Sequence, residues 1–177
     1  MNLKVLFVMN MHILLCIFMN KLSFHGQIPH QLGSLFRNQL QGSISSTLAC
    51  SRNLQNLTLN VNNLTGNIPL ELCVLPKLQF FHLVANYLTG TIPVFLGNIS
   101  SLQYLLLDGN NLHDCVPSEL GMLRHVILIN LHINHLTGEI PSSFSNCTNL
   151  LSLDLSLNQL RGHITPLELC SKSTRLR

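Results

Sequence analysis

The sequence predicts a repeat solenoid of the α/β class, in which short parallel strands stack side by side and line a concave face. A repeat of 24 residues is the first observation. Segments beginning at Leu54, Leu78, Leu102, Val126 and Leu150 align without gaps over their first fifteen positions. The second is that one such unit cannot bury its apolar side chains alone, whereas stacked units share one continuous core. The convex side is predicted to consist of short irregular or 3-10 segments.

The first half of each unit predicts a β-strand. Two apolar residues are separated by one variable residue, as at Leu57 and Leu59, and this period of two marks a strand with one buried face. The later units repeat the pair as Phe81 and Leu83, Leu105 and Leu107, Ile129 and Leu131, and Leu153 and Leu155. Stacked strands of this kind pair in a parallel sheet.

An asparagine and then a turn follow each strand. The asparagine column consists of Asn62, Asn86, Asn110, Asn134 and Asn158. An inward asparagine satisfies backbone groups that a turn leaves unpaired, which suits a stacked ladder. The glycine column, which allows a tight turn, consists of Gly66, Gly90, Gly138 and Gly162. Asp114 replaces this glycine in the third complete unit, and a locally bent turn is expected there because aspartate tolerates left-handed geometry.

The second half of each unit predicts the convex segment. It opens on an Ile-Pro or Val-Pro pair, such as Ile68-Pro69, whose proline fixes an extended entry. One apolar residue then closes the core from that side, and this column consists of Leu72, Leu96, Leu120 and Phe144.

The composition excludes several classes of protein. Hydrophobic residues make up 46% of the chain and charged residues 10%, which is too apolar for a disordered protein. The net charge of +3 is small and no block of Lys or Arg is present, so nucleic acid is not an expected partner. The cysteines form no CxxC pair and no zinc-like spacing with His, and buried free thiols are expected. They are Cys16, Cys50, Cys73, Cys115, Cys147 and Cys170.

The columns N-x-L-x-G-x-I-P-x-x-L-G, seen from Asn86 to Gly97 as NYLTGTIPVFLG, resemble the plant-specific class of leucine-rich repeat. The resemblance covers roughly Gly26 to Ile164. It implies a horseshoe-shaped solenoid of the kind that forms the ectodomains of plant receptor-like kinases and receptor-like proteins. It also implies a secretory, glycosylated protein that binds peptides, proteins or small hormones on its concave or lateral face. The kinase elements, namely the Gly-rich, HRD and DFG motifs, are missing, so kinase activity does not carry over.

The predicted function is therefore extracellular recognition by a fragment or truncated form of such an ectodomain. The expected partners are a protein or peptide ligand and a co-receptor, with contact to a membrane only through a parent receptor or a partner. No cofactor is expected. The predicted location is extracellular or at the plasma membrane, provided that the N-terminal segment acts as a signal. The alternatives are a secreted inhibitor of a cell-wall-degrading enzyme, similar to polygalacturonase inhibitors, and a truncated gene product without function.

The segments before the complete units depart from the pattern. Residues 1–25 contain a charged and then apolar stretch that fits either a signal peptide or a degraded upstream repeat. Residues 26–53 form incomplete repeats. Leu35 and Asn38 are three residues apart, where later units need eleven, so about one strand is missing and a local distortion is expected.

Five complete repeats occupy residues 54–170, and a basic tail occupies residues 171–177. In the fifth repeat Pro166 comes one place late, and no capping unit follows. Solenoids need caps to cover their last apolar layer. That layer is therefore expected to face water unless a partner covers it.

The variable strand positions are the candidate ligand-binding site, because they point outward on the concave sheet. Aromatic and histidine side chains on an exposed sheet suit contact with a ligand, although cross-strand packing between exposed neighbours gives the same pattern. The predicted concave-face residues are Phe80, His82, Tyr87, Tyr104, Asp108 and His132.

Four Asn-x-Ser/Thr sequons are candidate glycosylation sites, and they fit a secretory protein. They lie at Asn56, Asn63, Asn98 and Asn146. Asn63 follows the inward asparagine directly and is expected to be exposed. The repeat itself is rich in Asn, Leu and Thr, so the sequons also arise from its consensus.

Metal binding and catalysis are not predicted. His132 and His135 are three residues apart and no Cys or carboxylate is placed to complete a metal site. Asp108 and Asp154 lie two repeats apart, roughly 10 Å by strand spacing, which falls in the range of inverting glycosidases. An open sheet, however, offers no cleft that excludes water or raises a pKa.

Overall fold

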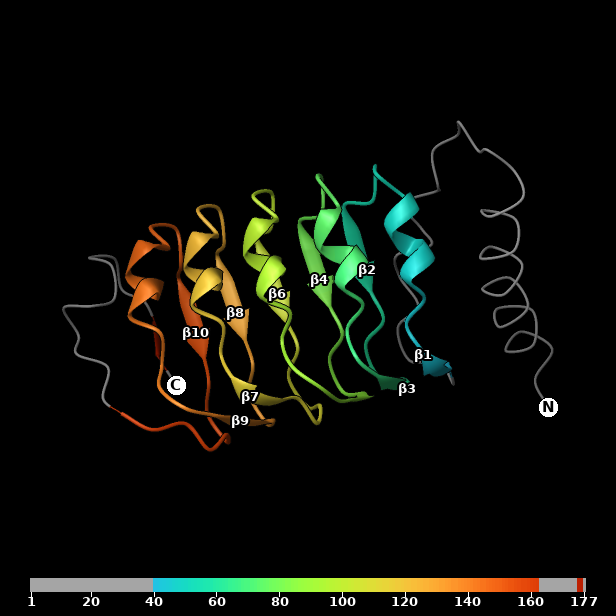
Figure 1. The fold of residues 1–177 in the computed structure, drawn as a ribbon. Coiled ribbons are helices and arrows are strands. Elements are labelled where there is room, and N and C mark those ends of the chain that lie inside the picture. The colour runs from blue at the N-terminus through green and yellow to red at the C-terminus, as the bar shows by residue number, and fades with distance from the viewer. Residues whose placement is uncertain (1–39, 163–174, 177) are drawn as a thin grey trace.

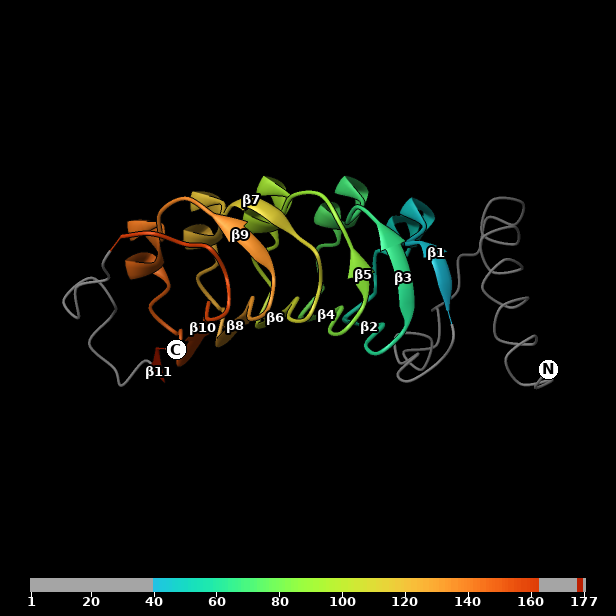
Figure 2. The ribbon, with the colours of Figure 1, turned by 90° about the horizontal axis from the view of Figure 1, so that it is seen from below.

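The computed structural model describes residues 40–162 and 175–176, and it confirms the predicted solenoid. The units stack into an arc whose inner side is a parallel sheet and whose outer side is a row of 3-10 helices (Figures 1 and 2). The expected signal peptide or upstream repeat, the missing strand and the displaced Pro166 all lie outside the described residues.

The concave sheet contains six strands in the order β11-β10-β8-β6-β4-β2. Their bounds are β2 (Asn56–Thr58), β4 (Phe80–His82), β6 (Tyr104–Leu106), β8 (Leu128–Asn130), β10 (Ser152–Asp154) and β11 (Arg175–Leu176). From β2 to β10 each residue pairs with the residue 24 positions later, as Phe80 does with Tyr104. β11 pairs with β10 through Ser152 and Arg175, so two residues of the expected tail continue the sheet.

A second row of parallel strands follows the asparagine column. The sequence pattern does not predict this row. Its strands are β1 (Gln41–Ser43), β3 (Asn63–Gly66), β5 (Tyr87–Leu88), β7 (His113–Cys115) and β9 (His135–Thr137). They form one sheet of β1, β3 and β5 and another of β7 and β9, with a bridge from Thr91 to His113 between them. This lateral row gives the solenoid a second strand-lined face (Figure 2).

The convex segments are 3-10 helices, as predicted. They are η2 (Ser46–Cys50), η3 (Leu70–Val74), η4 (Val94–Asn98), η5 (Ser118–Met122) and η6 (Ser142–Asn146). A proline precedes each of the last four, with φ between −61° and −64°. Gly97 and Gly121 allow close packing, since a Cβ on either would overlap the backbone oxygen of Glu119 or Ser143 in the next helix.

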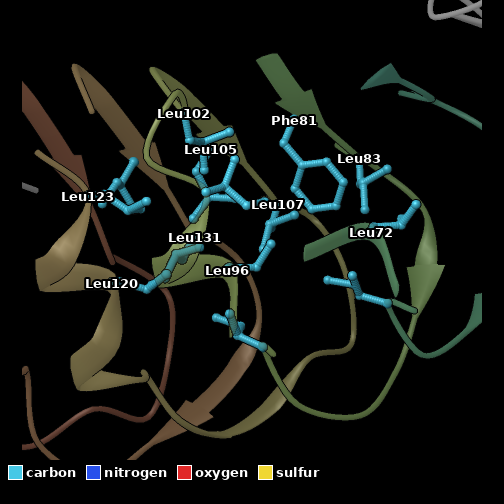
Figure 3. Packing of buried hydrophobic residues seen from close by; sticks show 14 of the residues in the cluster. Leu72, Phe81, Leu83, Leu96, Leu102, Leu105, Leu107, Leu120, Leu123 and Leu131 are labelled. Atoms are coloured by element: carbon cyan, nitrogen blue, oxygen red, sulfur yellow. The ribbon is translucent and has the colours of Figure 1, made fainter. Parts of the chain in front are cut away.

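The core is a continuous stack of leucines between the concave sheet and the 3-10 helices (Figure 3). The predicted strand residues and convex closing residues, such as Leu105 and Leu96, are fully buried. Leu160, in the last described turn, is only partly buried, whereas its equivalents Leu88, Leu112 and Leu136 are fully buried.

The asparagine column joins consecutive units, and it is buried from Asn62 to Asn134 and partly buried at Asn158. Asn110 illustrates the pattern: its side-chain oxygen accepts from the backbone N–H of Leu88 at 3.1 Å. Its side-chain nitrogen donates to the carbonyls of Leu83 and Leu107, both at 3.0 Å. Asn62, Asn86, Asn134 and Asn158 make equivalent bonds. One amide therefore satisfies buried backbone groups of two adjacent units.

The turn at Asp114 keeps the repeat geometry and needs no local bend. Its φ is +66°, close to the +76° to +79° of Gly66, Gly90 and Gly138.

The expectation of buried thiols is wrong for two of the four described cysteines. Cys50 and Cys115 are exposed, while Cys73 and Cys147 are buried, and all four are free.

We predict that Asn110→Ala lowers the free energy of unfolding by about 1–3 kcal/mol, because it leaves the buried N–H of Leu88 without a partner and removes one of the two amide donors to each of the carbonyls of Leu83 and Leu107. Urea unfolding followed by circular dichroism measures this loss. Asn111→Ala is the matched control, since Asn111 is exposed. Equal losses in the two variants would contradict the role of the asparagine ladder.

Candidate functional site

The outward positions of the concave strands form three rows that cross the sheet. The first row is Asn56, Phe80, Tyr104, Leu128 and Ser152, and the second is Thr58, His82, Leu106, Asn130 and Asp154. The third, two residues beyond the second, is Asn60, Val84, Asp108, His132 and Ser156. Five of the six predicted site residues therefore lie on this face. Leu128 and Leu106 extend its apolar part.

An aromatic cluster occupies β4 and β6. The rings of Phe80 and Tyr104 stack with centroids 4.8 Å apart and an interplanar angle of 5°. The imidazole of His82 meets both rings edge-on, at 5.8 Å from Phe80 and 6.4 Å from Tyr104. Such pairs contribute beyond their buried area, so the three rings form a fixed apolar platform.

A polar cluster lies beside this platform, toward the C-terminal units. The Nδ1 atom of His132 lies 2.7 Å from Oγ of Ser156 and 3.7 Å from Oδ1 of Asp154. The Ser156 hydroxyl donates to the same Asp154 oxygen. Asp108 lies within electrostatic range of both His132 and Asp154. The concave face thus carries two carboxylates around one imidazole.

The hydrogen bonds of this cluster run opposite to those of a hydrolytic triad. In a triad the serine hydroxyl donates to histidine, and the carboxylate holds the other imidazole nitrogen. Here the only hydroxyl proton of Ser156 is directed to Asp154, so Nδ1 of His132 must be the donor to Ser156. Serine and carboxylate also approach the same nitrogen. This geometry orients polar groups and does not activate Ser156 as a nucleophile.

Burial shifts the pKa of two residues on this face. Burial raises the pKa of Asp108; its own backbone N–H and His132 act in the opposite direction, and Asp154 adds to the rise. Burial also lowers the pKa of His82. Within the described part of the chain, Oδ1 of Asp108 and Nε2 of His82 are buried without a hydrogen-bond partner. Both groups are therefore held in an environment that disfavours their charged forms.

The placement of Tyr87 corrects the sequence prediction. Tyr87 lies on β5 in the lateral row, where it pairs with Thr65, and not on the concave sheet. The chain turns at the buried Asn86 before it reaches this position, so the strand alternation does not extend that far. Asp154 and Ser156 join the site through contacts to His132 that one sequence does not specify.

All four sequon asparagines are exposed. Asn56 lies on β2 at the concave face and Asn63 on β3 of the lateral row. Asn98 and Asn146 end the convex helices η4 and η6.

Metal binding and membrane insertion also bear on the candidate chemistry of residues 40–162 and 175–176. No group of three or more His, Cys, Asp or Glu in these ranges is arranged to hold a metal ion. No helix there has the length and apolar character that a membrane span requires.

Comparisons with known proteins agree with this geometry. A family model described as Leucine Rich Repeat matches residues 101–123 and 125–147. No curated protein matches the chain. Among solved structures, PEPR1-AtPEP1 is 30% identical with a TM-score of 0.76, over 86% of this chain and 22% of that one. The ectodomain of the Arabidopsis thaliana receptor kinase GASSHO1/SCHENGEN3, in complex with CASPARIAN STRIP INTEGRITY FACTOR 2, is 36% identical with a TM-score of 0.67, over 84% and 23%.

The Arabidopsis thaliana BIR3–SERK2 complex contains a chain that is 34% identical with a TM-score of 0.66, over 78% of this chain and 72% of that one. The fold and the repeat thus define a leucine-rich repeat solenoid. The chain belongs to the plant-type leucine-rich repeat family that forms receptor ectodomains. It spans under a quarter of the length of the first two structures.

We predict that the protein loses stability as the pH falls from about 7.5 to 5.5, and that His82→Asn reduces this loss. Burial lowers the pKa of His82 in the folded protein below the ordinary value of 6.5, so the unfolded chain binds the proton more readily. The stability contribution of neutral His82 is present above 6.5 and disappears as the pH falls through the lowered pKa.

Urea unfolding at several pH values measures this dependence. His135→Asn is the control, because His135 is exposed on β9 and the variant keeps His82. A pH dependence in His82→Asn equal to that of the unaltered protein would rule out the assignment to His82.

Proposed function

We propose that the concave sheet recognises an extended peptide or protein segment that presents an apolar side chain next to a basic group. The observation that carries this proposal is the position of the aromatic platform, Phe80, His82 and Tyr104, directly beside the acidic cluster of Asp108 and Asp154. A ligand that covers both needs one apolar and one cationic group at adjacent places.

The charge of the face supports a basic ligand. The outward rows of strands β2 to β10 and the positions that follow them contain two carboxylates and no Lys or Arg. Among the described basic residues, Arg52, Lys77 and Arg124 lie in the turns after the convex helices, and Arg161 pairs with Glu139 beside the lateral row. Arg175 lies on β11, at the C-terminal edge of the concave sheet. Although the chain has a net charge of +3, strands β2 to β10 therefore present a negative surface, which attracts cationic groups over acidic ones.

The aromatic platform supports an apolar neighbour to that cation. Phe80 and Tyr104 are already stacked on each other, so a ligand does not have to order them on binding. Phe80 and Tyr104 are half-buried, and preordered aromatic residues of this kind are typical anchors of protein interfaces. An arginine side chain could also extend over the Tyr104 ring while its guanidinium reaches the carboxylates.

The neighbouring solved structures favour recognition over catalysis. PEPR1 was crystallised with AtPEP1, and the ectodomain of the receptor kinase GASSHO1/SCHENGEN3 was crystallised with CASPARIAN STRIP INTEGRITY FACTOR 2. For this chain we accordingly propose ligand capture as part of an extracellular or membrane-anchored receptor, of which the chain is a fragment. The BIR3–SERK2 complex adds a co-receptor as a second class of partner to be tested.

The alternative of a secreted inhibitor predicts a different ligand. An inhibitor of a cell-wall-degrading enzyme binds a folded protein, whereas the platform and acidic cluster described above fit a short segment. Binding to short peptides in isolation favours the receptor proposal.

We predict that this chain selects Lys- or Arg-containing peptides from a positional-scanning peptide library, with an aromatic or aliphatic residue close by. Tyr104→Ala is expected to weaken the selected peptides about tenfold, which corresponds to about 1.4 kcal/mol. Asp108→Asn and Asp154→Asn are expected to weaken them and to reduce the salt dependence of binding. Biolayer interferometry measures both effects.

Two matched controls make the experiment specific. Tyr87→Ala removes an exposed aromatic ring from the lateral row, and Asp114→Asn removes one negative charge while keeping a residue that tolerates φ of +66°. Neither should alter binding. Selection of acidic peptides, or equal losses in the controls, would overturn the concave assignment.

A further inference from the structure

The convex face carries an exposed apolar patch around one sequon. Val74, Phe95 and Met122 expose 61%, 52% and 56% of their surface on the convex helices, where Leu70 and Val94 are also exposed, at 56% and 44%. The core beneath them is complete without them, since Leu72, Leu96 and Leu120 are fully buried. These three side chains therefore contribute little to the fold and leave apolar surface in water.

Asn98 lies at the centre of this patch. Val74, Asn98 and Met122 are the last residues of η3, η4 and η5, which are neighbouring turns of the stack (Figure 1). Phe95 precedes Asn98 by three residues within η4, and side chains three apart in a 3-10 helix eclipse one another. An apolar side chain thus borders Asn98 on both adjacent helices and within its own helix.

We propose that Asn98 carries an N-linked glycan that covers the convex apolar patch of Val74, Phe95 and Met122. Asn98-Ile99-Ser100 is a sequon, and Asn98 is exposed while Ile99 is buried. A glycan is bulky and solubilising, and here its first sugars extend from the middle of the patch. The inference rests on the proposed extracellular setting and is independent of the ligand of the concave face.

The modification is a transfer from a lipid-linked oligosaccharide diphosphate. The side-chain nitrogen Nδ2 of Asn98 forms a bond to C1 of the first N-acetylglucosamine and loses one proton. The bond between C1 and the diphosphate oxygen breaks, and the lipid diphosphate leaves with that electron pair. No oxidant or reductant is needed.

The other sequons have fewer apolar neighbours. Asn146 occupies the same position at the end of η6, but the residue three before it is Ser143, whose hydroxyl donates to the backbone oxygen of Ser118. Asn56 and Asn63 lie on the concave and lateral faces. Asn146 also has Met122 on the adjacent helix η5, but it has no counterpart of Phe95 in its own helix, so it is a control with the same backbone position and fewer apolar neighbours.

The test uses the full chain with a cleavable secretion signal placed ahead of Met1, expressed in eukaryotic cells. Enzymatic deglycosylation in oxygen-18 water marks each occupied asparagine, and peptide mass spectrometry then reports occupancy at each sequon. Sedimentation velocity compares self-association of the secreted protein with Asn98→Gln, Ser100→Ala and Asn146→Gln. Ser100→Ala removes the sequon while keeping Asn98.

We expect Asn98 to be occupied. Asn98→Gln and Ser100→Ala are expected to self-associate at about tenfold lower protein concentration than the unaltered protein, and Asn146→Gln is expected to behave like the unaltered protein. Adding Phe95→Ser and Met122→Ser to Asn98→Gln should restore the monomer, which separates exposure of the patch from misfolding.

Three outcomes overturn the inference. An empty Asn98 beside occupied sequons refutes the glycan while leaving the extracellular setting intact. Equal self-association of Asn98→Gln and Asn146→Gln refutes the covering role. Occupancy of no sequon refutes the extracellular setting as well, so failure of the inference and failure of the proposed function are distinguishable.

Discussion

The hydrogen bonds of the buried asparagines are the interaction on which the rest of this structure depends. Each amide bonds backbone groups of its own unit and of the unit before it, as Asn86 does with Leu83 and Leu59. Those backbone groups lie inside the solenoid, where an unmet hydrogen bond costs about 1–3 kcal/mol. The column therefore fixes how consecutive units stack: concave strands pair residues 24 positions apart, as Phe80 does with Tyr104, and lateral strands pair residues 22 positions apart, as His113 does with His135.

Because the stacking of the units is fixed by the asparagine column, the residue types at the outward positions of the concave strands can differ between units while the fold is kept. Phe80 and Tyr104 are adjacent because they occupy the same place in neighbouring units, and no other contact is required to bring them together. The same register sets Asp154 next to Asn130, two residues before His132. The proposed recognition surface lies in the variable rows, whereas the constant columns form the core. His82 and Asp108, whose pKa values are shifted by burial, both lie in the variable rows.

The sequence predicts the placement of the side chains in the constant columns well, and the placement and contacts of the variable side chains less well. Alternation and the 24-residue period place Phe81, Leu105 and the buried asparagines correctly, because their burial is enforced in every unit. Tyr87 was misplaced because alternation stops at Asn86, where the chain enters the lateral row. The exposure of Cys115 was missed for a similar reason, since it lies on β7 of that row. Pairings such as His132 with Ser156 depend on rotamers, which periodicity does not encode.

The residue before each asparagine shows that the ladder outweighs local preference. Val61, Ala85, Ile133 and Leu157 all have φ between +51° and +56°, a region that costs a residue other than glycine roughly 1–2 kcal/mol. Only Gly109, among the five described units, suits this position by propensity. The backbone groups of these residues nevertheless complete the inter-unit bonds, as Ile133 does by donating to Ser156 and accepting from Asn110. Strain that recurs in step with the asparagines is therefore a consequence of the ladder, and it does not by itself mark a binding site.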